Sequence, residues 1–141
     1  MSLSLTKALV VAVLSVNATV AQVNPDINLM AHMVQAEAGE QPEDGQRLVV
    51  DVVLNRVGSE FFPDTVSEVI LSPGQFAVVS NGAIRRATPQ DEIYRYILEE
   101  MRERTNTEVF YFTAGGYNPS GEAWQKVGDH YFSKLRKELQ W

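Results

Sequence analysis

Residues 26–39 read Asp-Ile-Asn-Leu-Met-Ala-His-Met-Val-Gln-Ala-Glu-Ala-Gly, and this stretch decides the fold. Its apolar side chains recur at spacings of three and four residues, which predicts an amphipathic helix with one face in a protein core. Those side chains are Ile27, Met30, Val34 and Ala38. Asp26 is expected to cap the first turn, and Gly39 to end the helix. Glu37, three residues after Val34, places a carboxyl group on the same core-facing stripe.

Three segments farther along the chain also have helical patterns. Residues 42–58 predict a core helix, because they are rich in apolar side chains and begin with proline and two acidic residues. Residues 64–71 predict a short helix with a Thr-x-x-Glu capping box, closed by Ser-Pro-Gly. Residues 88–104 predict a third long helix. The buried stripe expected on this third helix consists of Ile93, Ile97 and Met101.

After the third helix the pattern changes from helical to extended. Residues 109–112 predict a short strand, residues 113–121 a glycine-rich turn, and residues 124–132 a second extended segment. No repeat, low-complexity stretch or flexible linker divides the chain. The sequence therefore predicts one α+β domain at residues 25–141, with about three main helices packed beside a small antiparallel sheet.

The composition excludes several classes of function. The chain has 141 residues and a formal net charge of −6 at pH 7, so it lacks a global positive field that would attract nucleic acid or an anionic membrane surface. It contains no cysteine, which rules out disulfides, thiolate zinc sites and a cysteine nucleophile. Nucleic acid is therefore not an expected partner.

The N-terminal residues 1–24 have two interpretations. Lys7 precedes an apolar run at residues 8–14, and residues 19–21 read Thr-Val-Ala, a loose match to the small-x-small pattern of a signal-peptide cleavage site. The run is shorter than the ~20 apolar residues that span a bilayer. The segment is therefore either a secretory signal peptide or an N-terminal helix that packs on the domain.

Glu37 is the residue that the pattern singles out for chemistry. A carboxyl group on a core-facing stripe is partly desolvated, and desolvation raises its pKa because it disfavours the charged form. A carboxyl group that keeps its proton near neutral pH can donate that proton to a leaving oxygen. The alternative interpretation is a glutamate at a frayed helix end, whose side chain simply reaches solvent.

Short motifs occur in a fixed order through most of the chain. They are Ala36-Glu37-Ala38, Gly45-Gln46, Val52-Val53-Leu54-Asn55-Arg56-Val57, Phe62-Pro63-x-Thr65-Val66, Pro73-Gly74-Gln75-Phe76, Tyr111-Phe112 and Lys126-Val127-Gly128-Asp129-His130-Tyr131-Phe132. In this order they closely resemble the SleB-type cell wall hydrolase family, which includes spore-cortex-lytic enzymes and lytic transglycosylases. The resemblance covers roughly residues 29–133.

The resemblance implies a lysozyme-superfamily domain in which Glu37 cleaves the MurNAc–GlcNAc glycosidic bond of peptidoglycan. In such an enzyme the glutamate protonates the glycosidic oxygen and then, as a base, helps the sugar's own 6-hydroxyl attack the anomeric carbon, which leaves an anhydro-muramic end. The expected partners are peptidoglycan glycan strands, the expected state is a monomer, and no metal or organic cofactor is implied. The compact format is similar to phage or prophage lysins, so the protein is expected to be secreted and wall-associated, or phage-encoded and active on the wall.

A hydrolytic muramidase would instead need a second carboxyl group, ~5 Å from the first for retention of configuration or ~6.5–9.5 Å for inversion. Many members of the family read Ala-Glu-Ala-Arg-Gly-Glu-Pro where this chain reads Ala-Glu-Ala-Gly-Glu-Gln-Pro at residues 36–42. Gln41 thus takes the place of the family's second acid, and Asp129 stands where related chains often carry asparagine. Glu40 and Asp129 are the candidate second carboxylates.

Four further residues are candidates for substrate binding. Gln75 and Phe76 lie on the turn after the short helix, where Gln75 either binds a sugar or is satisfied by the backbone. Tyr111 either stacks on a sugar or packs in the core. His130 either contacts substrate or is buried and hydrogen-bonded in the small sheet. The residues expected to orient the second helix against the active-site turn are Asn55 and Arg56.

Other functional classes fit the sequence less well. A zinc peptidase acting on the peptide stems would need more than the two histidines, His32 and His130, and no His-Glu-x-x-His occurs. No Gly-x-Ser-x-Gly elbow supports serine catalysis. A non-catalytic wall-binding or virion-structural module with the same fold is the remaining alternative, because the acidic segment after Glu37 departs from the family pattern.

Overall fold

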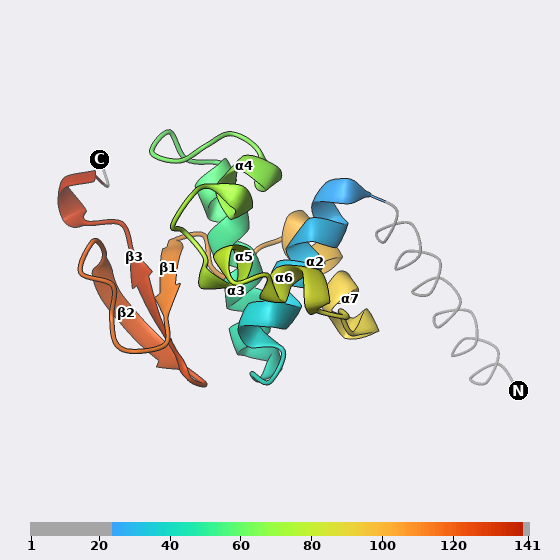
Figure 1. Cartoon of the computed structure of the whole chain (residues 1–141). Helices are drawn as coiled ribbons and strands as arrows, with labels where there is room; N and C mark the ends of the chain where they lie inside the picture. The colour runs from blue at the N-terminus through green and yellow to red at the C-terminus, as the bar shows by residue number, and fades with distance from the viewer. Residues whose placement is uncertain (1–23, 140–141) are drawn as a thin grey trace, which may run out of the picture.

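A computed structural model describes residues 24–139 of the chain (Figure 1). The elements run in the order α2 (Pro25–Ala38), α3 (Glu43–Val57), α4 (Val66–Leu71), α5 (Ala77–Ser80), α6 (Ala83–Arg86), α7 (Asp91–Arg102), β1 (Val109–Thr113), β2 (Glu122–Val127), β3 (His130–Lys134) and η1 (Lys137–Leu139). Within residues 24–139, no helix is both long and apolar enough to cross a membrane. The predicted signal peptide or N-terminal helix at residues 1–24 lies outside the described residues, apart from Asn24.

Helix α2 begins directly after Asn24, whose side-chain oxygen accepts hydrogen bonds from the backbone N–H groups of Asp26 (3.1 Å) and Ile27 (3.2 Å). Asn24 is therefore the N-cap, and the prediction that Asp26 caps the helix was wrong. Asp26 lies in the first turn, where its negative charge meets the positive end of the helix. The predicted end is confirmed, since the helix stops at Ala38 with Gly39 as its C-cap.

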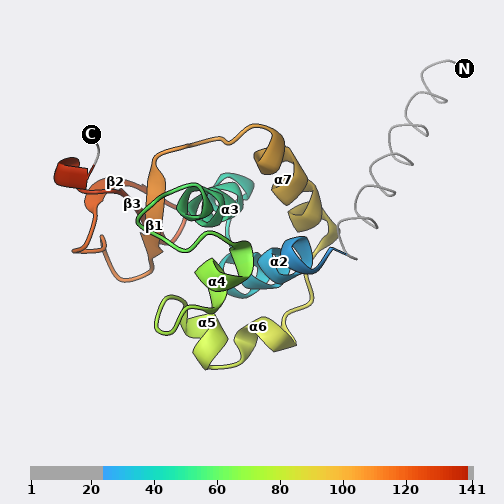
Figure 2. The same ribbon diagram turned by 90° about the horizontal axis from the view of Figure 1, so that it is seen from above.

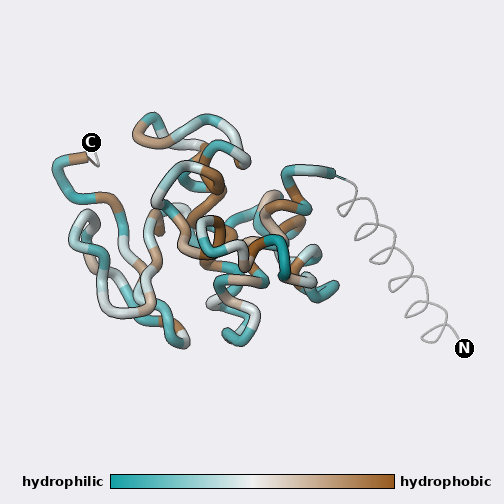
Figure 3. Tube along the Cα trace, viewed as in Figure 1, coloured by the Kyte–Doolittle hydropathy of each residue, from teal (hydrophilic) through white to brown (hydrophobic). Residues whose placement is uncertain are grey.

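Helix α3 occupies the centre of the molecule. Figure 2 shows it between the sheet on one side and α2 and α7 on the other, and it packs against β1, α2, α4 and α7. Every side chain from Leu48 to Arg56 is buried. The apolar stretches drawn in brown in Figure 3 gather along α2 and α3. A helix that is buried around its whole circumference lies within a core, which confirms the prediction for residues 42–58.

The core of α3 contains a buried carboxyl group, Asp51, which is 0% exposed. Asp51 and Glu100 of α7 hydrogen-bond to each other, and Glu100 also accepts hydrogen bonds from Arg47 Nη1 (2.9 Å) and the backbone N–H of Thr105 (2.7 Å). Burial, together with the neighbouring Glu100, raises the pKa of Asp51 to about 8. Burial acts on Glu100 in the same direction, but the hydrogen bonds it accepts outweigh burial and lower its pKa. The pair therefore shares one proton at neutral pH and ties α3 to α7.

The sheet has the strand order β1-β3-β2, and both neighbouring pairs are antiparallel. Phe132 of β3 is 0% exposed, pairs with Phe112 of β1, and belongs to the main core. The extended segment predicted at residues 124–132 is two strands, because Gly128, with a φ of +58°, turns the chain back after Val127. Long helices beside a small antiparallel sheet confirm the predicted α+β class.

Two short helices, α5 and α6, were not predicted. Each has four residues, about one turn, which is too short for a repeating apolar pattern. The third long helix is confirmed but ends at Arg102, two residues earlier than predicted. The prediction of its buried stripe is confirmed for Ile93 and Ile97, which are both 0% exposed. It is wrong for Met101, which is 51% exposed. Glu100, one residue earlier, takes the inward position where it bonds to α3.

The turn between β2 and β3 gives a stability prediction. A Cβ atom on Gly128 would lie 2.3 Å from Oε1 of Gln41, and Gln41 cannot move away without losing two hydrogen bonds to Asp129. The left-handed backbone costs any other residue about 1–2 kcal/mol in addition. We expect Gly128→Ala to lower the free energy of unfolding by about 2–3 kcal/mol, measured by urea denaturation.

Gly74→Ala is the matched control for this prediction. Gly74 also has a positive φ, +78°, but no heavy atom lies within 4 Å of a Cβ placed there. Gly74→Ala should therefore lower the free energy of unfolding only by the cost of the left-handed backbone, about 1 kcal/mol. Adding Gln41→Ala to Gly128→Ala should recover the steric part of the loss. Equal losses for Gly128→Ala and Gly74→Ala would show that Gln41 does not restrain the turn.

Candidate active site

Glu37 lies in the last turn of α2, and a side chain from α3 fixes the end of that helix. Gln46, which is 6% exposed, donates from Nε2 to the backbone oxygens of Ala38 (3.1 Å) and Gly39 (3.5 Å). Carbonyl groups at a helix end otherwise lack partners. The Gly45-Gln46 motif therefore positions the turn that carries Glu37.

The Glu37 carboxyl group is half-buried, and this burial raises its pKa above the ordinary value of 4.5. A hydrogen bond from the backbone of Val78, in α5, acts in the opposite direction without cancelling the effect. The position at the end of α2 acts in the same direction as burial, because a carboxylate there meets the negative end of the helix dipole. The predicted desolvation is confirmed, and a glutamate that lies wholly in solvent is excluded.

Arg56 of α3 is the centre of a cluster of site candidates. It is 4% exposed, and it donates from Nε to the backbone oxygen of Phe110 (2.8 Å) and from Nη1 to Oε1 of Gln75 (3.1 Å). Three aromatic ring centroids surround its guanidinium carbon: Phe62 at 4.9 Å, Phe76 at 5.2 Å and Tyr111 at 5.4 Å. Arg56 thus ties α3 to the turn and to β1, as expected for a residue that orients the second helix.

Three of the four predicted substrate-binding residues therefore meet at Arg56. Gln75 is exposed, and its amide oxygen is satisfied by Arg56 rather than by the backbone. Tyr111 is half-buried on β1. Phe76 is 6% exposed and stacks on Phe112 with ring centroids 5.7 Å apart, so little of its ring is available to a sugar. The substrate contacts of these residues stay predictions.

His130 lies at the start of β3 and is 5% exposed. Its ring meets Phe112 and Phe132 edge to face, with centroids 5.3 and 6.2 Å away. Burial lowers the pKa of His130, although Asp129 acts in the opposite direction, so the structure favours the neutral form of the ring. The predicted burial is confirmed, but the predicted hydrogen bond is missing at Nδ1, which has no partner among residues 24–139. Contact with substrate stays a prediction.

Asn55, the other residue expected to orient the second helix, contacts a different segment. Its Nδ2 donates to the backbone oxygens of Asn106 and Val109, both at 2.9 Å. Asn55 therefore fixes α3 against the start of β1 rather than against the active-site turn. The expected structural role is right, and the expected partner was wrong.

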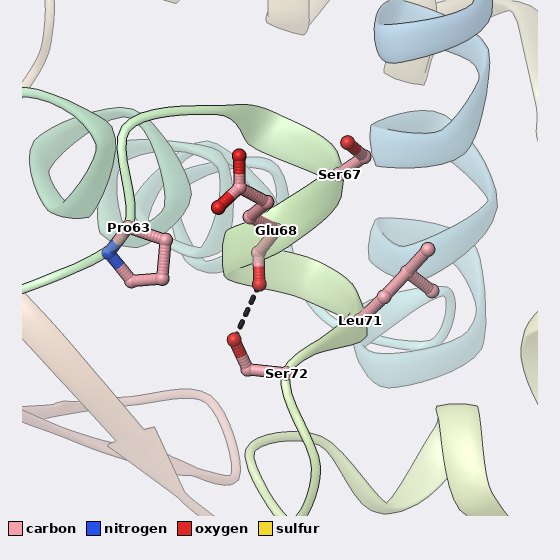
Figure 4. A pocket seen from close by; sticks show the side chains of 5 residues that line it. All are labelled: Pro63, Ser67, Glu68, Leu71 and Ser72. Carbon is pink, nitrogen blue, oxygen red and sulfur yellow. Dashed lines mark hydrogen bonds between the residues drawn. The ribbon is translucent and has the colours of Figure 1, made fainter.

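An inner pocket of about 220 Å³ opens beside Arg56. The residues that line it are Arg56, Phe61, Phe62, Pro63, Val69, Ser72 and Gln75. An outer pocket of about 360 Å³ lies along α4 (Figure 4). It shares Pro63 and Ser72 with the inner pocket, so the two adjoin. The outer pocket is completed by Ser67, Glu68 and Leu71.

Glu37 lines neither pocket, and residues 75–78 connect it to the inner one. Gln75 contacts Arg56 at one end of this segment, and the backbone of Val78 contacts Glu37 at the other. Successive Cα atoms are 3.8 Å apart, so the two ends of the segment lie at most ~11 Å from each other. A single four-residue segment thus contacts both the pocket and Glu37.

The two candidate second carboxylates lie at the surface. Glu40 is exposed and forms no hydrogen bond or ion pair with the described residues. Asp129 is exposed in the β2–β3 turn, where its Oδ2 accepts from Nε2 of Gln41 (3.0 Å) and its backbone N–H donates to Oε1 of Gln41 (2.8 Å). Gln41 and Asp129, two of the positions where the sequence departs from the pattern of the resemblance, thus form one hydrogen-bonded pair.

Two features of this region, the burial of the Arg56 charge and the contact of Val78 with Glu37, were not predicted from the sequence. Arg56 follows Val52 by four residues and Val53 by three on a core helix, so a buried cation in need of partners could have been predicted from the spacing. The backbone of Val78 gave no signal, because α5 is a single turn. Its approach to Glu37 depends on tertiary packing alone.

A family model described as Cell Wall Hydrolase matches residues 40–133 of the chain. The chain belongs to the cell wall hydrolase family. The match includes Arg56, Gln75 and Tyr111, and it begins three residues after Glu37. The family resemblance predicted from the motifs is therefore confirmed, while the role of Glu37 is not part of what the match shows.

Curated relatives of this cell wall hydrolase family member include spore cortex-lytic enzymes. The enzyme of Oceanobacillus iheyensis is 35% identical over 127 residues, which cover 85% of this chain and 45% of that protein. The enzyme of Bacillus subtilis is 35% identical over 100 residues, which cover 71% of this chain and 28% of that protein. The chain thus spans less than half the length of these relatives.

Two solved structures share the fold of this family member. The catalytic domain of the Bacillus cereus SleB protein has a TM-score of 0.68 and 33% identity, and the alignment covers 77% of this chain and 89% of that one. The catalytic domain of the germination-specific lytic transglycosylase SleB from Bacillus anthracis has a TM-score of 0.67 and 32% identity, with coverage of 79% and 95%. The predicted lysozyme-like α+β fold is confirmed.

Proposed function

We propose that this family member degrades peptidoglycan by cleaving the MurNAc–GlcNAc bond as a lytic transglycosylase, with Glu37 as its single acid and base. The observation that carries the proposal is a half-buried carboxyl group with a raised pKa at the end of a fixed core helix. The relatives named as spore cortex-lytic enzymes and the neighbour named as a lytic transglycosylase support the reaction.

Each proton in the proposed reaction passes through Glu37. The protonated side chain donates to the glycosidic oxygen as the bond to the anomeric carbon breaks. The resulting carboxylate accepts the proton of the muramic 6-hydroxyl as that oxygen attacks the anomeric carbon, which forms the 1,6-anhydro ring and restores the acid. The raised pKa favours the protonated starting state, and the backbone hydrogen bond from Val78 stabilises the ionised intermediate state.

The site of action in this proposal is the cell wall. The substrate is a polymer of the wall, so the enzyme acts there whether it is secreted by a bacterium or encoded by a phage. The same reaction serves wall remodelling and lysis.

A single acid implies that neither surface carboxylate is needed. We expect Glu40→Gln and Asp129→Asn to change dye release from labelled sacculi by less than about twofold, because loss of a second catalytic carboxylate would cost about 10²-fold or more. Asparagine at position 129 can still accept the hydrogen bond from Gln41, so the turn should keep its structure. A large loss of rate in either variant, with an unchanged melting temperature, would indicate a two-carboxylate hydrolase.

The non-catalytic wall-binding or virion-structural module stays the second candidate. The altered segment after Glu37 suggested it, and the Gln41–Asp129 pair gives that alteration a structural reason that leaves Glu37 in place. Incubation with dye-labelled sacculi separates the two functions. If the protein sediments with the sacculi but releases no dye, even at high protein concentration, the enzymatic function is wrong and the protein is a binding module.

A further inference from the structure

Arg56 carries a buried positive charge without a buried negative partner. Its hydrogen bonds go to the neutral oxygens of Phe110 and Gln75, and its Nη2 has no partner among residues 24–139. No ion pair joins it to a carboxylate of the described residues. Removing a cation from water without a counter-ion is costly. The same burial lowers the pKa of Arg56 to about 10.

Arg47, also on α3, shows how this fold pairs another partly buried arginine. Its guanidinium group pairs with Glu43 at 3.1 Å, Glu99 at 2.9 Å and Glu100 at 2.9 Å, although it is more exposed than Arg56. The contrast indicates that the charge of Arg56 is left for a ligand. Aromatic rings and neutral oxygens hold the guanidinium in position without neutralising it.

The inner pocket beside Arg56 has the character of a site for a small carboxylic acid. Phe61, Phe62, Pro63 and Val69 form its apolar walls, and its polar side chains besides Arg56 are Ser72 and Gln75, neither of which is charged. A planar guanidinium group is well matched to a carboxylate. The outer pocket contains the carboxyl group of Glu68 (Figure 4), which repels an anion. Of these two pockets, the inner one is therefore the one that favours an anion.

We propose that the inner pocket binds a carboxylate of the substrate, paired with Arg56. Which part of the substrate supplies this carboxylate is inferred from the proposed function. Muramic acid has a lactyl carboxylate where no peptide is attached, and a peptide stem has carboxylates of its own. Gln75, which lines the pocket, and Val78, whose backbone contacts Glu37, have Cα atoms at most ~11 Å apart, so we expect the bound group to belong to the cleaved saccharide or to its neighbour. Arg56 is thus a specificity-determining residue.

Binding can be measured without turnover, by following the Arg56 Nε–Hε signal in ¹⁵N-labelled protein during titrations with small probes. N-acetylmuramic acid tests the lactyl carboxylate, and N-acetylmuramoyl-L-alanyl-D-isoglutamine tests a peptide carboxylate. The methyl ester of each probe is its neutral control. We expect a saturable shift with at least one acid and none with its ester, and the acid that binds identifies the source.

Gln75→Glu is the variant that tests the charge pairing. It places a carboxylate at the position that now accepts from Nη1 at 3.1 Å, so the protein supplies its own counter-ion. We expect at least tenfold weaker binding of the acid and an unchanged or higher melting temperature. Glu68→Gln, in the outer pocket, is the matched control and should bind the acid at least as well as the wild type.

Three results would overturn the inference: no saturable shift with either acid, equal binding of an acid and its ester, or wild-type affinity in Gln75→Glu. Its failure is distinguishable from failure of the proposed function. If the protein cleaves peptidoglycan but binds neither acid, only the carboxylate-binding inference is wrong. If the protein binds an acid but cleaves no peptidoglycan, the proposed function is wrong and the carboxylate site stands.

Discussion

Glu37→Gln is expected to slow dye release from labelled peptidoglycan by about 10²–10⁴-fold, the range that general acid–base catalysis contributes. The amide has nearly the volume of the carboxyl group but no transferable proton. It still fits the half-buried site, and its oxygen can still accept the hydrogen bond from Val78. The melting temperature should therefore change by only a few degrees. Rate and melting temperature are measured on the same preparation.

Glu60→Gln is the matched control for the loss of a carboxyl group. Glu60 is exposed and forms no hydrogen bond or ion pair with the described residues, so its variant should keep the wild-type rate. The wild type should also lose activity as the pH rises through the raised pKa of Glu37, because only the protonated form can donate. A folded Glu37→Gln protein with wild-type turnover would refute the assignment.

Asp51→Asn is expected to raise the free energy of unfolding at pH 9 by about 3 kcal/mol. In the wild type, burial raises the pKa of Asp51 to about 8 from an ordinary value of 3.8. The folded protein therefore keeps a proton that the unfolded chain releases near pH 4. Asparagine carries no charge to bury, can accept the hydrogen bond from the backbone of Asn106, and can donate to Glu100.

The direction of the pH effect follows from the raised pKa. Below about pH 4 the side chain is protonated in both states, and its contribution to stability is fully present. As the pH rises toward 8, that contribution is lost progressively, because the unfolded state alone is free to ionise. Urea denaturation of the wild type from pH 4 to pH 9 should show this slope, and Asp51→Asn should lack it.

Asp64→Asn is the control for this second prediction. Asp64 is exposed and forms no hydrogen bond or ion pair with the described residues, so its variant should follow the wild-type pH dependence. If Asp51→Asn lost stability at every pH, the carboxyl group would be a required ionic partner. The account of a proton shared between Asp51 and Glu100 would then be wrong.

The parts of the fold that the sequence predicted are those in which one repeating pattern decides burial. Helices α2, α3 and α7 were predicted because an apolar face recurs over three or more turns in each. The cap of α2 was wrong because Asn24 and Asp26 are both good capping residues. The choice between them depends on where the backbone turns, which the apolar pattern does not encode.

The other errors, in the fold and in the site, have a common physical reason. Met101 and Glu100 are adjacent, and Glu100 points inward because its partners Asp51 and Arg47 lie on another helix. His130 was predicted to be buried from its alternating segment, but its neighbour Phe112 comes from another strand. The partner of Gln41 is likewise 88 positions away along the chain. Contacts of this kind follow from packing rather than from local pattern.

The most direct test of Glu37 as the single acid and base is mass spectrometry of purified peptidoglycan digested by the wild type and by Glu37→Gln. The account predicts muropeptides that end in anhydro-muramic acid from the wild type and none from the variant. Reducing ends from the wild type would contradict it, because they require water as the nucleophile and a second carboxyl group to activate the water or the sugar.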